Sequence, residues 1–286
     1  MKSQLKSVIV YILVIVLLTV ILFPFYWMFI SSLKPIEEIM TRNPTLVPIH
    51  PTLSHYIDLI NPAALYGGWE RGGRFFLIFI QNSLIVAGGS TVISVFLSVL
   101  GGYSLARFRY KGRELIAGSM LFVYMFPGVL LLVPMYELMS KAHLLDTHLS
   151  LIIVYVTFSA PFSVWLLRSF LETIPIEIEE AAMVDGASRL GAFFRVMLPL
   201  AGPGIVTVAT FSFITAWGEY MFSSILMFTD TMKTVPTGLA MYMGYQYIEW
   251  GMLLTGSVVT VIPVLLLFLP LANLFLKGLT AGAIKG

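Results

Sequence analysis

Six long apolar segments separated by short polar stretches run along this sequence. A helix rises 1.5 Å per residue, so about 20 apolar residues can cross the roughly 30 Å hydrocarbon core of a bilayer. The segments of sufficient length are residues 8–30, 75–106, 115–136, 148–167, 198–228 and 251–276. Pro127-Gly128 and Pro134 are expected to break the third segment, which a membrane helix tolerates where neighbouring helices satisfy the freed carbonyls. The pattern predicts an all-α polytopic membrane protein with six transmembrane helices.

The first apolar segment and the polar insertion after it form a distinct N-terminal part, residues 1–74. The segment ends in an aromatic belt, Pro24-Phe25-Tyr26-Trp27, which favours an uncleaved signal anchor over a signal peptide. Residues 31–74 are rich in proline and too polar for a core of their own. We expect short helices in an extracytoplasmic loop, which either touches a partner on that side or merely connects two spans.

Composition supports the membrane assignment and excludes several kinds of chemistry. Of the 286 residues, 58% are hydrophobic and only 11% are charged, which no ordinary soluble domain shows. The formal net charge of +2 does not suggest a nucleic-acid partner. With no cysteine there is no disulfide, Cys-ligated zinc or thiol catalysis, and the chain lacks a phosphate-binding P-loop motif and the H-E-x-x-H and G-x-S-x-G signatures. Any ATP-driven process in which this chain takes part would need a separate ATPase.

Small residues and basic residues refine the arrangement. Ser90, Ser94, Ser98 and Gly102 recur every fourth residue, a stripe that lets another helix approach closely. With the N-terminus inside, eleven of the seventeen Lys and Arg residues are cytoplasmic, as the positive-inside rule requires. These eleven are Lys2, Lys6, Arg107, Arg109, Lys111, Arg113, Arg168, Arg189, Arg195, Lys277 and Lys285. Both termini and the 107–114 and 168–197 loops are therefore expected in the cytoplasm of a multi-pass protein of the cell (inner) membrane.

A dense polar stretch between the fourth and fifth segments, residues 177–186, is the chain's clearest candidate for a docking surface. Pro175 suits a first helical turn, and Glu177, Glu179 and Glu180 would lie near the positive end of the helix dipole. Gly186 is expected to end this helix and Ser188 to cap a second one. Ile178, Ala181, Ala182 and Asp185 then share a flat face that another protein's surface could approach.

This stretch resembles the EAA signature of binding-protein-dependent ABC transporter permeases. The matching residues are Glu180-Ala181-Ala182, Gly186 and Val196-Met197-Leu198-Pro199, with Val196 where isoleucine is commoner. In that family the loop is a coupling helix that fits a cleft in the ATPase subunit. The resemblance therefore implies a type I ABC importer permease fold and a coupling loop at 175–198. Its expected ATPase-coupling residues are Glu180, Ala181, Ala182, Asp185, Gly186, Leu198 and Pro199.

The C-terminal tail, residues 278–286, is the second point of resemblance. It looks like the tail of the smaller of the two maltose-type permease subunits, which reaches the interface between the ATPase subunits. By that resemblance Thr280, Gly282 and Lys285 contact the ATPase, whereas by composition alone the tail is a frayed basic end. The permease core, a five-helix unit, would span residues 75–277.

The resemblance also implies partners and a cargo. The expected partners are a homodimeric ABC ATPase, a second permease subunit and an extracytoplasmic sugar-binding protein. The expected cargo is a maltose- or trehalose-like di- or oligosaccharide. No cofactor is expected on this chain, because ATP and Mg act on the partner ATPase. Alternatives are a permease for a non-sugar solute, an ion-coupled secondary transporter and a membrane-embedded enzyme. The uncharged centres of the spans argue against the ion-coupled transporter. The enzyme is disfavoured because no catalytic group is assembled by spacing.

Residues for a translocation path are candidates by type only. Sugars are bound by aromatic faces and a few polar groups. The candidates are Asn82, Tyr124, Trp217, Glu219 and Tyr220. For the aromatic ones the alternative is a packing or lipid-belt role, which is the commoner one in membrane helices. Glu219 is expected near the outer end of the fifth span, either lining the path or contacting the delivery protein, or as a hydrogen-bonding group between helices. His143 and His148 flank Asp146 and are expected to be solvated rather than metal-binding.

Overall fold

The computed structural model describes residues 2–61, 75–244 and 248–283, with the side chains of residues 6–61, 75–244 and 248–268. These residues are helical apart from the loop at 40–53, shorter connections elsewhere and one isolated bridge between Met243 and Ile248. They divide into two compact units. Residues 1–77 and 238–262 form unit 1, and residues 78–237 and 263–286 form unit 2. The all-helical fold that the apolar pattern predicts is confirmed.

Unit 1 contains the first apolar helix and the loop after it. Its helices are α1 (Lys2–Ser32), α2 (Ile36–Ile39), α3 (Ser54–Ile60) and the beginning of α14 (Trp250–Ala283). None of the most apolar stretch of α1 is buried within the chain, as expected of an anchor helix that meets lipid or another subunit. The short helices expected in the loop are present.

The loop after α1 is held by polar contacts, of which those of Lys34 are buried. Lys34 is fully buried, and its ammonium donates to the Thr45 carbonyl (2.5 Å) and lies 4.5 Å from the centre of the Trp27 ring. Glu38 accepts hydrogen bonds from the Thr45 hydroxyl (2.6 Å) and the Ile49 N–H (3.0 Å). The described part of this loop is therefore ordered by its own side chains rather than extended.

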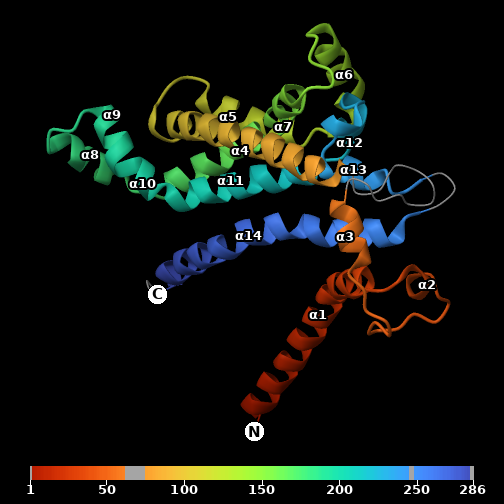
Figure 1. Ribbon diagram of the computed structural model, residues 1–286. Helices are drawn as coiled ribbons and strands as arrows, with labels where there is room; N and C mark the ends of the chain where they lie inside the picture. Colours follow the sequence, from red (N-terminus) through yellow and green to blue (C-terminus); the bar gives the residue numbers. More distant parts are fainter. Residues whose placement is uncertain (1, 62–74, 245–247, 284–286) are drawn as a thin grey trace. The chain divides into compact units, whose positions relative to one another are not determined.

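Unit 2 is a helical bundle with short helices at both of its ends. Its first helices are α4 (Phe76–Arg107, whose first two residues fall in unit 1), α5 (Arg113–Tyr124), η2 (Gly128–Leu131), α6 (Leu132–Lys141) and α7 (His148–Glu172). The loop after α7 contains α8 (Ile176–Val184), α9 (Arg189–Ala192), the π-helix η3 (Phe193–Met197) and α10 (Leu198–Leu200). Then follow α11 (Gly202–Trp217), α12 (Met221–Leu226) and η4 (Asp230–Met232). Helix α13 (Val235–Ala240) crosses to unit 1. Figure 1 shows α8 and α9 at one end of this unit and α6 at the other.

The serine and glycine stripe of α4 lies where the sequence predicts a close helix contact. Ser90, Ser94 and Ser98 are fully buried. A Cβ atom on Gly102 would lie 3.1 Å from the Arg168 backbone nitrogen, so α4 and α7 pack closely at this point. Helix α7 joins α11 in turn through Ser163 and Ser212, whose hydroxyl oxygens are 3.2 Å apart. Small residues thus lie where α4 meets α7 and where α7 meets α11, and they let these helices approach closely.

Six spans require that two bent helix pairs each count as one crossing. Among the residues that the structure describes, four helices are long and apolar enough to cross a membrane alone, and the pairs at 113–141 and 189–217 are bent by 88° and 69°. The break in the third segment lies at residues 125–127, as Pro127-Gly128 predicts, but Pro134 lies in the first turn of α6 and breaks nothing. A first-turn proline lacks only an N–H that has no helical partner.

The fifth apolar segment differs from the expected single helix, and the sixth lies in a longer helix. The fifth segment is not one helix over 198–228, because it bends at Ala201 and ends at Trp217, after which α12 begins at Met221. Composition hides this break, since apolar residues continue across it. The last helix, α14, contains the sixth apolar segment, 251–276, and continues beyond it to Ala283, so it includes most of the tail.

Candidate functional site

The loop between α7 and α11 is built as the local sequence requires. Gly186 follows α8 with φ +90°, a conformation that glycine adopts without a Cβ penalty, and its N–H donates to the Met183 carbonyl (3.1 Å). Ser188 caps α9 by accepting a hydrogen bond from the Gly191 N–H (3.1 Å). Both expectations are confirmed. Pro175 precedes the first turn of α8 as its N-cap rather than lying within it.

Helix α8 presents the EAA residues outward. Glu180, Ala181 and Asp185 are exposed, and Ala182 is half-buried. Ile178 is also exposed, and Val184, at the end of the helix, is 88% exposed. The described part of the chain therefore leaves this face of α8 open for a second protein.

The opposite side of α8 is attached to the bundle by a residue that sequence reasoning misjudged. Glu179 is 4% exposed instead of lying at a solvated helix end. Its carboxylate accepts a hydrogen bond from the Tyr103 hydroxyl and forms an ion pair with Arg107, Nε to Oε2 3.2 Å. Arg107 is the last residue of α4, not part of an exposed basic loop, and its side chain is only 8% exposed.

A weak signal for this contact exists in the sequence. Tyr103 and Arg107 are four residues apart at the end of one helix, so they share a face. That spacing tells which side chains act together, but it does not name their partner. Glu179 is the partner only because the α7–α8 connection turns back over the end of α4.

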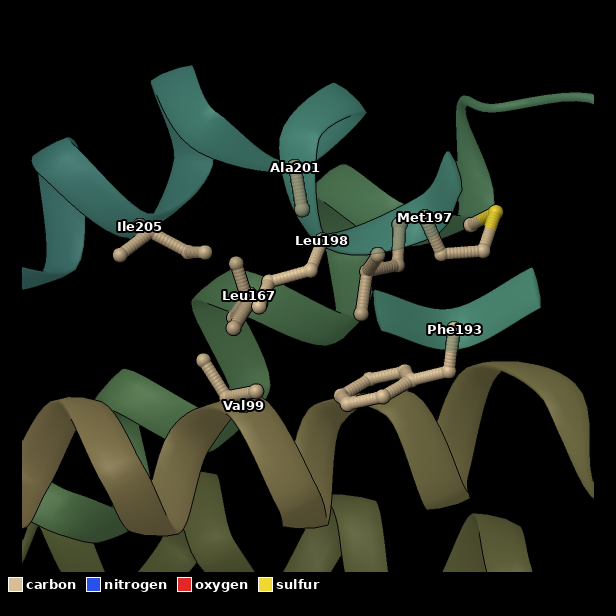
Figure 2. Close-up of a pocket in the computed structure, with 8 residues that line it drawn as sticks. Val99, Leu167, Phe193, Met197, Leu198, Ala201 and Ile205 are labelled. Atoms are coloured by element: carbon tan, nitrogen blue, oxygen red, sulfur yellow. The ribbon is translucent and has the colours of Figure 1, made fainter. Parts of the chain in front are cut away.

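The end of the loop packs into the apolar interior of unit 2. Leu198 is half-buried and Pro199 is exposed. Figure 2 shows Leu198 facing the same small apolar cavity as Val99 of α4 and Leu167 of α7. The cavity lies beside the π-helix η3, whose Phe193 and Met197 also line it. π-helical turns are frequent at functional sites.

The structure does not bring the five path candidates together at one surface. Asn82 is buried and fully bonded: its amide nitrogen donates to the carbonyls of Thr231 (2.8 Å) and Lys233 (2.9 Å), and its oxygen lies 2.9 Å from His148 Nε2. Trp217 is buried and stacks on Phe213. Tyr124 and Tyr220 are exposed, and Tyr124 stacks on Phe162 at 4.6 Å. His148 is therefore bonded, not merely solvated.

Glu219 joins helices. It lies in the break between α11 and α12, and its carboxylate accepts from the Tyr155 hydroxyl (2.6 Å) and the N–H groups of Phe222 (2.9 Å) and Ser223 (3.2 Å). It thereby connects α12 to α7. The sequence left three roles open for Glu219. The contacts described for this chain fit the role of a hydrogen-bonding group between helices.

Two of the three tail candidates lie in α14. Thr280 and Gly282 fall within the last turns of α14, the Thr280 side chain lies outside the part of the chain whose side chains are described, and Lys285 lies outside the described residues altogether. Within the described ranges, no group of three or more His, Asp or Glu could hold a metal ion.

Comparison with known proteins identifies the family. The family described as binding-protein-dependent transport system inner membrane component matches residues 94–280. The inner membrane ABC transporter permease protein YcjP of Escherichia coli (strain K12) is 42% identical over 271 residues, covering 94% of this chain and 93% of that protein. The trehalose/maltose transport system permease protein MalG of Thermococcus litoralis is 32% identical, covering 100% and 99%.

The fold has a counterpart among solved structures. A chain in the crystal structure of a bacterial ABC transporter involved in the import of the acidic polysaccharide alginate aligns with a TM-score of 0.79 at 20% identity, covering 95% of this chain and 97% of that one. This likeness supports the permease fold. The chain therefore belongs to the inner membrane components of binding-protein-dependent transport systems, as a permease component and not itself an enzyme.

Proposed function

We propose that this chain is one of two membrane-spanning subunits of an ATP-driven importer for a maltose- or trehalose-like di- or oligosaccharide. The second subunit is another permease chain, and an extracytoplasmic binding protein delivers the sugar. The names of two similar proteins support a carbohydrate cargo: the Thermococcus litoralis relative is named for trehalose/maltose, and the similar solved transporter for alginate. ATP and Mg act on a homodimeric partner ATPase.

The observation that carries this proposal is the two-sided character of α8. Its exposed side carries Glu180, Ala181 and Asp185, and its buried side carries Glu179. A helix that is anchored on one side and open on the other can accept force from a docked protein and pass it to the bundle. In this proposal closure of the ATPase dimer displaces the 175–198 loop, and the core at 75–277 opens toward the binding protein.

The remaining proposed sites lie in the N-terminal part at 1–74, in the core at 75–277 and in the C-terminal tail. Residues 1–74 form the anchor and extracytoplasmic loop, and both termini are cytoplasmic, so that Thr280, Gly282 and Lys285 reach the ATPase. Tyr124 and Tyr220 face the path, because both rings are exposed on this chain. Asn82, Trp217 and Glu219 shape the path from behind by holding the backbone and rings around it.

Co-purification followed by uptake tests the proposal. The chain, expressed with its neighbouring genes and purified, should bring along an ATPase and a second permease, and in proteoliposomes it should import labelled maltose or trehalose when the binding protein and ATP are present. Gly186→Pro should abolish uptake, because proline cannot adopt φ +90°. Glu180→Lys should also abolish it, because the charge on the docking face is reversed. Both variants should remain in the membrane.

Glu137→Lys is the matched control. Glu137 lies on α6 and is exposed in an ion pair with Lys141 (3.7 Å), so its reversal adds the same charge at the other end of unit 2. Uptake should be unchanged. ATP-independent uptake that an ionophore abolishes would instead indicate an ion-coupled carrier. Uptake of a non-sugar solute and of no sugar would contradict the proposed cargo, but it would not contradict the proposed coupling of α8 to the ATPase.

A further inference from the structure

Arg107 contacts the coupling loop at three points. Its Nη2 donates to the Ile174 carbonyl (2.8 Å), just before α8 begins. Its Nε pairs with Glu179 within α8 (3.2 Å), and its Nη2 also lies 3.9 Å from the Met197 sulfur, where the loop re-enters the bundle. One side chain at the end of α4 thus contacts the residue just before the coupling loop, the first half of α8, and the last residue of the π-helix η3.

Tyr103, one turn earlier on α4, reinforces this attachment. Its hydroxyl donates to the other carboxylate oxygen of Glu179. Its ring packs against Phe193 with ring centres 4.6 Å apart, and Phe193 is the first residue of the π-helix η3. The last turn of α4 therefore contacts both α8 and the segment that leads into α11.

The Arg107–Glu179 pair is buried, with side chains 8% and 5% exposed. Separating a buried pair leaves a charge without its partner in a medium that solvates it poorly, and this is strongly unfavourable. A displacement of α8 that kept the pair intact would take the end of α4 with it. The Ser94–Ser159 contact between α4 and α7 is neutral, whereas Tyr103 donates to the Glu179 carboxylate and Arg107 to the Ile174 carbonyl. Hydrogen bonds that involve a charged group are the stronger kind.

We propose that Arg107 is the positioning residue through which α8 moves α4, with Glu179 and Tyr103 as its counterparts. This inference rests on the proposed function, because it assumes that an ATPase displaces α8. It makes α4 the helix that receives the motion first. The contacts of Arg107 with Ile174 and Met197 hold the two ends of the loop at a fixed separation while it moves.

The test measures coupling rather than activity alone. The complete transporter, with partner permease, ATPase and binding protein, is reconstituted with Arg107→Gln or Glu179→Gln. The readout is sugar imported per ATP hydrolysed. We expect this ratio to fall about tenfold, within the range of ordinary coupling energies, while ATP hydrolysis continues. In the double variant Arg107→Gln/Glu179→Gln neither charge is left without its partner. Its ratio of sugar imported to ATP hydrolysed should therefore be no lower than that of either single variant.

Tyr103→Phe keeps the test informative if the arginine variant fails to assemble. It removes only the hydroxyl and keeps the ring against Phe193, so it should assemble and lower the ratio by a smaller factor. Arg109→Gln is the matched control, the same substitution at an exposed arginine two residues further along. It should leave the ratio unchanged.

Three outcomes would overturn the inference. A purely structural role would lower the amount of assembled complex and leave the ratio at the wild-type value in what remains. An equal loss in Arg109→Gln would indicate a general effect of positive charge. An unchanged ratio in Tyr103→Phe together with either buried-pair variant would show that the pair transmits nothing. Failure of the wild-type complex to import sugar would refute the proposed function instead.

Discussion

Ser94 and Ser159 meet between α4 and α7 with their hydroxyl oxygens 2.7 Å apart, both side chains buried. This contact is possible only because the two backbones approach closely along the small-residue stripe of α4. The same stripe ends at Gly102. A Cβ atom there would meet the backbone and a Cβ of α7: Arg168 N at 3.1 Å, Leu167 Cβ at 3.3 Å and Val164 O at 3.3 Å. Such atoms cannot move aside alone.

Gly102→Val should therefore push α4 away from α7. Overpacking of this kind lowers the free energy of unfolding by about 1–3 kcal/mol. Thermal unfolding of the purified protein in detergent measures the loss. Gly88→Ala is the control on the same helix, since nothing lies within 4 Å of its Cβ position, and it should change stability by less than about 1 kcal/mol. Equal losses in both variants would contradict close packing at Gly102.

Glu219 should act as a structural acceptor. Three donors converge on its carboxylate, the Tyr155 hydroxyl and the Phe222 and Ser223 N–H groups, and Glu219→Gln replaces one acceptor oxygen with a donor. The free energy of unfolding should fall by about 2 kcal/mol, the scale of a hydrogen bond to a charged group.

A double-mutant cycle in the same thermal assay distinguishes this role from a general surface effect. Tyr155→Phe removes one donor and should be the milder change. The double variant Tyr155→Phe/Glu219→Gln should be less destabilised than the sum of the two by at least about 0.5 kcal/mol, since the residues share one hydrogen bond. Strict additivity would show that the hydroxyl and the carboxylate do not interact.

Asp146 fixes the turn before α7 to the segment after α12. Its carboxylate accepts from the Phe228 N–H (2.9 Å) and from the hydroxyl (2.5 Å) and N–H (3.2 Å) of Thr229. Partial burial opposes ionisation of Asp146, but these hydrogen bonds prevail and lower its pKa below the ordinary value. A lowered pKa in the folded state means that the ionised form stabilises the fold.

The pH dependence follows from that sign. The stabilisation is fully present above the unfolded pKa, about 3.9, and it is lost as pH falls through the lower folded pKa. Asp146→Asn keeps the shape and tolerates the left-handed backbone at this position (φ 58°). It should cost about 1 kcal/mol at pH 7, with no change in this difference between pH 5 and 8 and a smaller difference below about pH 4.

Thermal unfolding at several pH values measures the Asp146 effect. Glu137→Gln is the control, because it removes an exposed pair with Lys141 and such pairs contribute little. A difference between Asp146→Asn and the natural protein that grows as pH falls would reverse the sign of the linkage and contradict the argument.

Features that depend on one residue and its immediate neighbours in the chain could be predicted from the sequence. The left-handed turn at Gly186 and the cap at Ser188 each depend on one residue and its immediate neighbours. The stripe from Ser90 to Gly102 depends on helical periodicity alone. The membrane fold followed from segment length and apolarity, although the bends at residues 125–127 and Ala201 show that apolar continuity does not guarantee a continuous helix.

The contact that matters most to the candidate site could not be predicted in this way. Tyr103 and Glu179 are 76 residues apart in the chain. Periodicity describes which face of a helix a residue occupies, but not which distant segment returns to that face. By its position alone Glu179 looks like a first-turn acidic residue, and Arg107 like one of several basic residues at a cytoplasmic helix end. Only the tertiary fold separates these two residues from their exposed neighbours Glu180 and Arg109.

The absence of cysteine from the whole chain offers a direct test of which end of unit 2 meets the ATPase. Val184→Cys places a single thiol on α8 at a position that is 88% exposed. A membrane-impermeant thiol reagent should not label it in intact cells, should label it in inside-out vesicles, and should react more slowly once the ATPase is bound. Glu137→Cys, on α6, should be labelled in intact cells regardless of the ATPase. Labelling of Val184→Cys from outside would place the coupling loop on the wrong side of the membrane for an ATPase to reach it. Unchanged reactivity of this thiol with the ATPase bound would show that α8 is not its docking surface.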